Sequence, residues 1–84
     1  MYQVDIIGYV LEEPIENIET GEVELKINPS KTDIVQNIIF KNNLALVALI
    51  DAKKGYMTSV KGHFESAKRL VADRVVFIKT EEKE

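Results

Sequence analysis

The fold of this chain is decided by residues 53–64, which read KKGYMTSVKGHF. Gly55 follows an apolar run and two lysines, and a glycine in that place commonly ends a helix. The residues after it alternate between apolar and polar side chains, which is the period of a strand with one buried face. Gly62 lies inside this strand and predicts a bulge or a sharp bend. A second strand, residues 3–11, also has an interior glycine, Gly8, and two bent strands in so short a chain predict a small closed β-barrel.

Length and composition indicate one globular domain. The chain has 84 residues, of which 45% are hydrophobic and 30% charged, enough for one modest core. We expect one β-barrel domain over residues 1–79 and a flexible acidic tail over residues 80–84. The absence of cysteine excludes disulfides and thiolate metal sites. The longest apolar run, residues 44–50, is too short to span a bilayer, and residues 2–10 lack the apolar core of a signal peptide, so we expect a soluble, cytoplasmic protein.

Charge is distributed unevenly along the chain. The net charge is −3, but residues 1–30 hold seven acids and one base, whereas residues 31–78 hold eight bases and four acids. The acidic total disfavours strong non-specific binding to polyanions. The local surplus of lysine and arginine in the second half predicts a weak basic groove. An ordinary solvated charged surface is the alternative explanation of the same pattern.

Three further strands and one helix complete the predicted elements. After a turn at Gly21, residues 22–28 alternate as a strand, and residues 32–40 are rich in β-branched side chains. Residues 42–53 begin with two asparagines, continue with alanine and leucine, and end near two lysines, which favours a helix. A buried strand is the alternative for this run. Residues 70–79 are expected to form the closing strand.

This order of elements predicts a mainly β fold, a five-stranded OB-fold barrel with one short helix between strands 3 and 4. Four segments are informative beyond their order: IGYVLEEP at 7–14, TGEV at 20–23, the pieces IIFK, LA, KKG and VKG between 38 and 62, and LVADRVVFI at 70–78. In sequence and spacing they resemble the single-stranded DNA-binding proteins of bacteria and phages, over most of the chain. The resemblance implies binding of single strands without sequence-specific readout, and assembly as a homo-oligomer. Unlike that family, the chain has no tryptophan and only a short connection at residues 65–69.

The resemblance and the charge pattern together suggest a binding surface. A single strand is held by cations that replace its counterions and by flat side chains that stack on bases, each stack contributing ~1–3 kcal/mol. The candidate nucleic-acid-binding residues are Lys26, Lys31, Phe40, Lys41, Lys61, Lys68 and Arg69. The resemblance places two of the family's stacking positions near Ile34 and Arg69. For each lysine an ordinary surface position is the alternative, and for Phe40 the alternative is a core position.

We expect no enzyme, no metal site and no cofactor. The four glycines are scattered, which excludes a glycine-rich phosphate loop, and His63 has no metal-ligand set or catalytic partner in the sequence. Two functions are open: a single-stranded DNA-binding protein of DNA replication, recombination or repair, and an OB-fold protein-interaction or regulatory module that has lost nucleic-acid binding. We also expect a homo-oligomer paired through the edge strand at residues 2–10, a replication or regulatory protein as a further partner, and no membrane partner.

Overall fold

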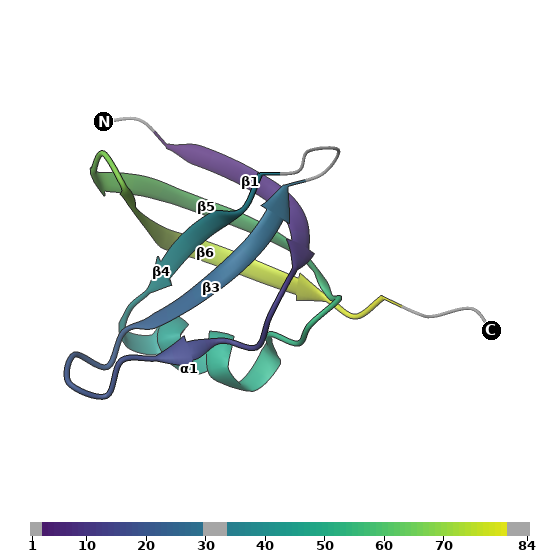
Figure 1. Cartoon of the computed structure of the whole chain (residues 1–84), viewed down its shortest axis with the longest axis horizontal. Coiled ribbons are helices and arrows are strands. Elements are labelled where there is room, and N and C mark those ends of the chain that lie inside the picture. The colour runs from purple at the N-terminus through teal and green to yellow at the C-terminus, as the bar shows by residue number, and fades with distance from the viewer. Residues whose placement is uncertain (1–2, 30–33, 81–84) are drawn as a thin grey trace.

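The computed structural model describes residues 3–29 and 34–80. Its elements are β1 (Val4–Val10), β2 (Ile15–Glu16), β3 (Val23–Pro29), β4 (Gln36–Phe40), α1 (Asn42–Asp51), β5 (Met57–Ser66) and β6 (Arg69–Ile78). The strands follow the order β1-β5-β6-β4-β3-β2, and a further pairing between β1 and β3 closes the sheet into a barrel (Figure 1). All neighbours are antiparallel except β4 and β6. The predicted OB-fold is confirmed: five long strands with α1 between the third and the fourth, and a two-residue β2 added at the edge.

Two glycines allow the strands to approach closely enough for the barrel to close. Gly8 lies where β1 changes partners, because it pairs with β5 on one side and with β3 on the other. A Cβ atom on Gly8 would overlap the carbonyl oxygen of Asn28, and one on Gly62 would overlap the carbonyl oxygen of Val71. The register of β5 against β6 shifts between Lys61 and Gly62. The bulge predicted at Gly62 is therefore confirmed, and its physical cause is the approach of two backbones.

The barrel is filled by apolar side chains from all five long strands. The largest fully buried ones are Phe40, Leu25, Ile27, Ile38, Leu70, Val10, Val23 and Val60. One polar side chain, Thr58, is buried among them, and its hydroxyl donates a hydrogen bond to the carbonyl oxygen of Val76 at 2.9 Å. Because inward and outward positions alternate along each strand, the side chains between these core residues face outward and form the surface of the barrel.

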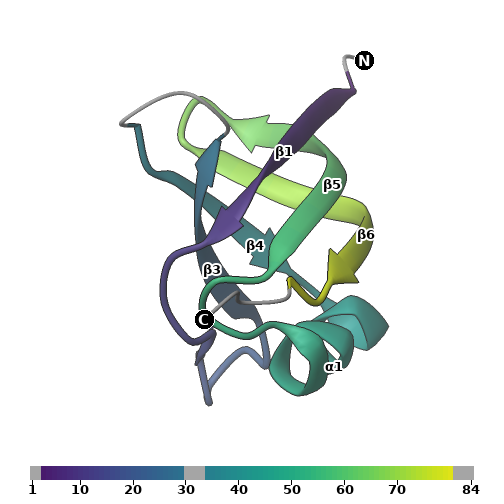
Figure 2. The ribbon, with the colours of Figure 1, turned by 90° about the vertical axis from the view of Figure 1, so that its right-hand side faces the viewer.

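Helix α1 covers one end of the barrel (Figure 2). It packs through small side chains, since Ala45, Ala48 and the following Ala52 are all buried. The predicted helix is confirmed, but it ends at Asp51, before the two lysines. The two asparagines that favoured a helix start here lie inside the helix: the N-cap residue is Lys41, and it makes no capping side-chain hydrogen bond. In the ranges that the structure describes, no helix is both long and apolar enough to cross a bilayer.

Two connections differ from their predicted limits. The third long strand begins at Gln36 instead of residue 32, and residues 30–33 lie outside the described ranges. The connection predicted at residues 65–69 is only a two-residue turn, because β5 and β6 both extend into it. Glu65 and Arg69, which were expected on a loop, are therefore held on strands, whereas Lys68 lies in the turn. Of the predicted tail, residues 81–84 lie outside the described ranges as well.

Candidate nucleic-acid interface

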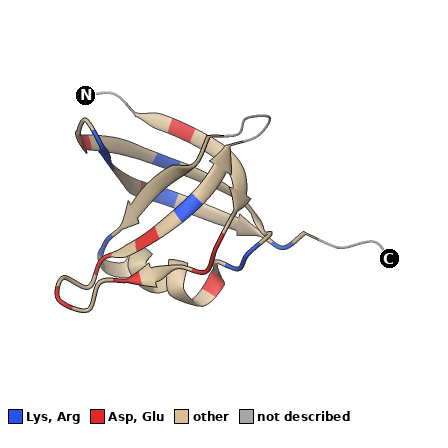
Figure 3. Cartoon of the chain, viewed as in Figure 1, with Lys and Arg blue, Asp and Glu red and all other residues tan. Residues whose placement is uncertain are grey.

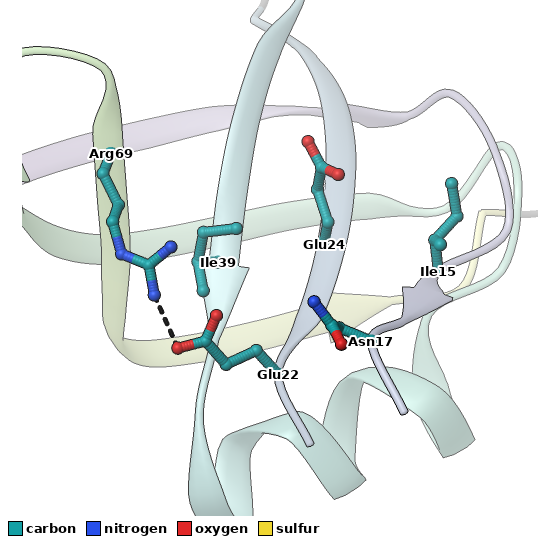
Figure 4. Close-up of a pocket in the computed structure, with 6 residues that line it drawn as sticks. All are labelled: Ile15, Asn17, Glu22, Glu24, Ile39 and Arg69. Atoms are coloured by element: carbon teal, nitrogen blue, oxygen red, sulfur yellow. Dashed lines mark hydrogen bonds and ion pairs between the residues drawn. The ribbon is translucent and has the colours of Figure 1, made fainter. Parts of the chain in front are cut away.

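An open pocket of about 320 Å³ lies on the outer face of β3 and β4. Its lining residues are Ile15, Asn17, Glu22, Glu24, Ile39 and Arg69 (Figure 4). Glu24 points outward from the middle of this surface, and the strand register places Ile15 of β2 on one side of it and Ile39 of β4 on the other. The pocket thus combines an apolar surface with two carboxylates and one guanidinium group.

A tight turn between β2 and β3 positions one wall of this pocket. The side-chain oxygen of Asn17 accepts hydrogen bonds from the backbone N–H groups of Glu19 at 3.0 Å and Thr20 at 3.3 Å. Gly21 then takes a φ of 77°, which glycine adopts without steric cost. The turn delivers Glu22 to the start of β3 with its carboxylate directed toward β6 (Figure 4).

Four charged side chains form a continuous series of ion pairs at this end of the pocket. Arg69 donates from Nη2 to Oε2 of Glu22 at 2.5 Å and from Nε to Oε1 of Glu65 at 3.0 Å. The other carboxylate oxygen of Glu65 accepts a hydrogen bond from Nζ of Lys41 at 2.7 Å. The hydrogen bonds from Lys41 and from Arg69 lower the pKa of Glu65, and those to Glu22 and to Glu65 raise the pKa of Arg69. We call Glu22, Lys41, Glu65 and Arg69 the charged quartet.

The structure brings four of the predicted contact residues to this face. Lys41 and Arg69 belong to the charged quartet, and Lys68 is exposed in the turn directly before Arg69. Lys26 lies on the outer side of β3, two residues beyond Glu24, and pairs in register with Asn37 of β4. Together they place cations at both ends of the pocket.

Two other predicted contact residues are not part of this cluster. Lys61 is exposed on β5, where its register partners are Asp5 of β1 and Arg74 of β6, so it lies on a different face of the barrel. Lys31 lies outside the described ranges.

Phe40 does not face the pocket. It is fully buried, and the centroid of its ring lies 6.4 Å from that of Phe77. Its prediction as a contact residue is wrong, because Phe40 occupies an inward position of β4, and the core alternative is confirmed. The position near Ile34 is exposed but aliphatic. Tyr9 and Phe64 are the exposed aromatic side chains among the described residues, and neither lines the pocket.

The lining of the pocket is not basic. Glu22 and Glu24 outnumber Arg69, whose charge is already paired. Figure 3 shows acidic residues at the β2–β3 turn and on β3, whereas basic residues are spread over β3, β5, β6 and the β5–β6 turn. The prediction that the basic second half lines the groove is therefore wrong for this pocket. The reason is topological: four of its six lining residues come from β2, β3 and the turn between them, which belong to the acidic first half of the sequence.

Sequence reasoning missed both carboxylates of the charged quartet. Glu22 and Arg69 are 47 residues apart, and their contact depends on closure of the barrel. His63 also has a partner that the sequence did not indicate: its Nδ1 lies 2.9 Å from Oδ2 of Asp73 within the β5–β6 hairpin, where the register shifts at the β-bulge. Within the described residues, no three histidine or acidic side chains are grouped so as to hold a metal ion.

A second exposed surface lies on the outer side of β1, β5 and β6. One cross-strand row consists of Tyr9, Met57 and Ile78, and the next of Ile7, Ser59 and Val76. The exposed fractions of Ile7, Tyr9, Val76 and Ile78 range from 44% to 58%, and we call these four residues the apolar face. A charged row of Asp5, Lys61 and Arg74 borders it.

The fold is found in solved structures of proteins that bind single strands. The mitochondrial single-stranded DNA-binding protein Rim1 of S. cerevisiae, in its crystal form 2, matches with a TM-score of 0.78 and 19% sequence identity, over 95% of this chain and 96% of that one. Its selenomethionine-labelled form gives a TM-score of 0.78 at 17% identity, over 95% and 97% of the two chains. Crystal form 1 gives 0.73 at 18% identity, over 98% of both. The chain therefore shares its fold with these proteins along nearly its whole length.

Comparisons of sequence identify no family for the chain. No protein-family model matches the chain. No curated protein matches it either. The likeness to Rim1 is thus a likeness of fold.

Proposed function

We propose that the chain binds single-stranded DNA without reading its sequence, and that it acts in DNA replication, recombination or repair. The observation that carries this proposal is the barrel itself, which superposes on Rim1 along 95% of its length and leaves an open pocket on β3 and β4. Cations from three separate parts of the chain surround that pocket. In this role the chain catalyses no reaction. We propose that it acts in the cytoplasm.

The path of the strand follows from the position of the charges. Lys26 lies at one end of the pocket, and Lys68 and Arg69 lie at the other, so the phosphates contact both ends. The bases then lie over Ile15 and Ile39, which offer an apolar surface but no aromatic ring. Because an aromatic stack contributes ~1–3 kcal/mol per base, this surface predicts weak binding. Contacts to phosphates select no base, so the binding is independent of sequence.

Fluorescence anisotropy with a short oligo-dT at low (about 20 mM) and moderate (about 150 mM) salt tests the proposal. We expect binding at low salt that weakens as salt rises, with a log–log slope of about −0.7 for each phosphate contact. Lys26→Ala removes one such contact and flattens the slope, whereas Lys53→Ala, an exposed lysine beyond the end of α1, is the matched control. If no binding is measurable even at low salt, the proposal is wrong.

A protein-interaction or regulatory module is the second candidate. It is favoured by the two carboxylates of the pocket, Glu22 and Glu24, which repel phosphates and attract a basic partner. This reading predicts a stable complex with a protein and no salt-dependent affinity for DNA. Affinity purification after nuclease treatment separates the two candidates: a protein recovered in fixed ratio supports the module, and recovery of nucleic acid alone from untreated extract contradicts it.

We propose in addition that the chain forms a homo-oligomer. The edge strand predicted at residues 2–10 corresponds to β1, which pairs with β5 over Val4–Tyr9 but with β3 only over Gly8–Val10. On the β3 side, its first half has no strand partner among the described residues, and an open edge favours pairing with another chain. The apolar face lies beside this edge, and clustered exposed apolar side chains mark interaction surfaces.

A further inference from the structure

The charged quartet joins parts of the barrel that are far apart in sequence. Glu22 directly precedes β3, Lys41 lies between β4 and α1, and Glu65 and Arg69 belong to the two strands of the β5–β6 hairpin. Two positive and two negative charges balance within it. Each of the four side chains is 24% to 37% exposed, so ions and ligands from solution can reach all of them.

Glu65 occupies the centre of this arrangement. One of its oxygens accepts from Lys41 at 2.7 Å and the other from Arg69 at 3.0 Å, so both are in use. A second donor group of Arg69 is taken by Glu22. Carboxylates and phosphates offer a guanidinium group the same paired oxygen acceptors. The two glutamates thus occupy the positions on Arg69 and Lys41 that a phosphate of the DNA backbone needs.

We propose that Glu22 and Glu65 are internal competitors of the phosphate backbone, and that they mask Lys41 and Arg69 in the free protein. The inference rests on the proposed function, and it explains what limits the affinity of the chain for single-stranded DNA. Lys26 and Lys68 form no ion pair with any described residue, so they are available to a strand from the start. The strand gains Lys41 and Arg69 only by displacing the carboxylates. Exposed ion pairs are individually weak, so the displacement lowers affinity without preventing binding.

Removal of the competing charge tests this directly. Glu65→Gln releases Lys41 and leaves Arg69 paired with Glu22 alone, whereas Glu22→Gln leaves Arg69 paired with Glu65 alone. Each substitution keeps the size of the side chain. Glu16→Gln is the matched control, because Glu16 is exposed on neighbouring β2 and forms no ion pair within residues 3–29 and 34–80. All three variants lose one negative charge near the same face, so a general reduction of repulsion affects them alike. Binding of oligo-dT is measured by anisotropy over a series of salt concentrations, after circular dichroism has verified folding.

We expect Glu65→Gln to bind about three- to tenfold more tightly than the unchanged protein, which corresponds to the release of one or two exposed ion pairs. Its log–log salt slope should steepen by about 0.7, because Lys41 loses its ion pair and becomes free to meet a phosphate. Glu22→Gln should show at most about half that change in slope, because Arg69 keeps Glu65 as a partner, and Glu16→Gln should show none. Should Glu65→Gln prevent folding, Glu22→Gln against Glu16→Gln provides the same comparison.

The outcomes separate this inference from the proposed function. Binding by the unchanged protein with equal slopes in all variants overturns the competition and leaves the proposed function standing. Binding by Glu65→Gln alone supports the competition in its strongest form, a site closed by its own carboxylates. If neither the unchanged protein nor any variant binds at low salt, both the proposed function and the inference fail.

Discussion

Gly62 is important because it has no side chain. A Cβ atom there would overlap the carbonyl oxygen of Val71 and would lie 3.3 Å from the Cα of Ala72. Both are backbone atoms, which cannot rotate away as the end of a flexible side chain can. The register of β5 against β6 shifts at the same place. At this residue, therefore, closure of the barrel depends on the small size of glycine.

Gly62→Ala should destabilise the barrel by about 1 to 3 kcal/mol, the usual cost of forcing an extra methyl group into a well-packed site. The control is Gly21→Ala. Its Cβ would meet no atom within 4 Å, although its φ of 77° disfavours alanine. That strain alone costs about 1 to 2 kcal/mol. Urea denaturation measures both free energies of unfolding, and a Gly62→Ala variant as stable as the unchanged protein would contradict the close approach of the two backbones.

Substitution of Phe40 distinguishes a role of this side chain in the core from a role in nucleic-acid binding. Because its side chain is fully buried beside Phe77, Phe40→Leu should lower the free energy of unfolding by about 1 kcal/mol and leave oligo-dT affinity unchanged. A stacking side chain would instead contribute about 1 to 3 kcal/mol of binding per base. Paired urea and anisotropy measurements decide between the two. Weaker binding by a fully folded Phe40→Leu variant would restore Phe40 as a contact residue.

At the scale of elements, the β5–β6 hairpin is held to β3 and to the start of α1 by charge as well as by its hydrogen bonds to neighbouring strands. Glu65 and Arg69 stand on either side of its two-residue turn and pair with each other, with Lys41 and with Glu22. Because the hydrogen bonds from Lys41 and Arg69 lower the pKa of Glu65 in the folded protein, the contribution of this carboxylate to stability depends on pH.

The direction of that dependence follows from the direction of the pKa change. A carboxylate whose folded-state pKa lies below its ordinary value of 4.5 stabilises the protein fully above that pH and loses the contribution as pH falls through the lowered pKa. The unchanged protein should therefore melt at a higher temperature than Glu65→Gln at neutral pH, and the two should converge in acid. Thermal melts from pH ~7 to pH ~2.5 measure this. A constant difference between the two proteins over the whole range would contradict it, and Glu16→Gln is the control without an ion pair among the described residues.

Local patterns in the sequence predict the elements well and the contacts between them poorly. Alternation in β3 and the interior glycines are local signals, and they predicted the strands, the bulge and the barrel. Exposed Ile34 and Val35 are β-branched but precede β4, so composition placed the start of that strand too early. Glu22 and Arg69 are 47 residues apart, and they meet only because the barrel brings the start of β3 close to the start of β6. No single segment of the sequence predicts that contact. Local segments therefore predict the cations but not the carboxylates that pair with them.

At the scale of the whole molecule, the barrel has two outer faces of different chemistry. The pocket face on β3 and β4 is polar, charged and partly neutralised. The outer surface of β1, β5 and β6 contains the apolar face, which lies beside the open edge of β1. Lys61, predicted as a DNA contact, lies on this second face with Asp5 and Arg74 as neighbours. If the chain self-associates there, the pocket face stays open, so that assembly and strand binding use separate surfaces.

Val76→Lys tests that division of surfaces. Val76 is 58% exposed on the β6 side of the apolar face, and a lysine there would carry an unpaired charge into an interface formed by a second copy. We expect the unchanged protein to have the mass of an oligomer by light scattering and Val76→Lys to have the mass of a monomer. Leu46→Lys is the matched control, because Leu46 is also 58% exposed but lies on α1, away from that face. A monomeric unchanged protein would contradict the homo-oligomer, and monomers produced equally by both variants would contradict the assignment to this face. A monomeric Val76→Lys that still binds oligo-dT with an unchanged affinity per chain would show that strand binding does not use the apolar face.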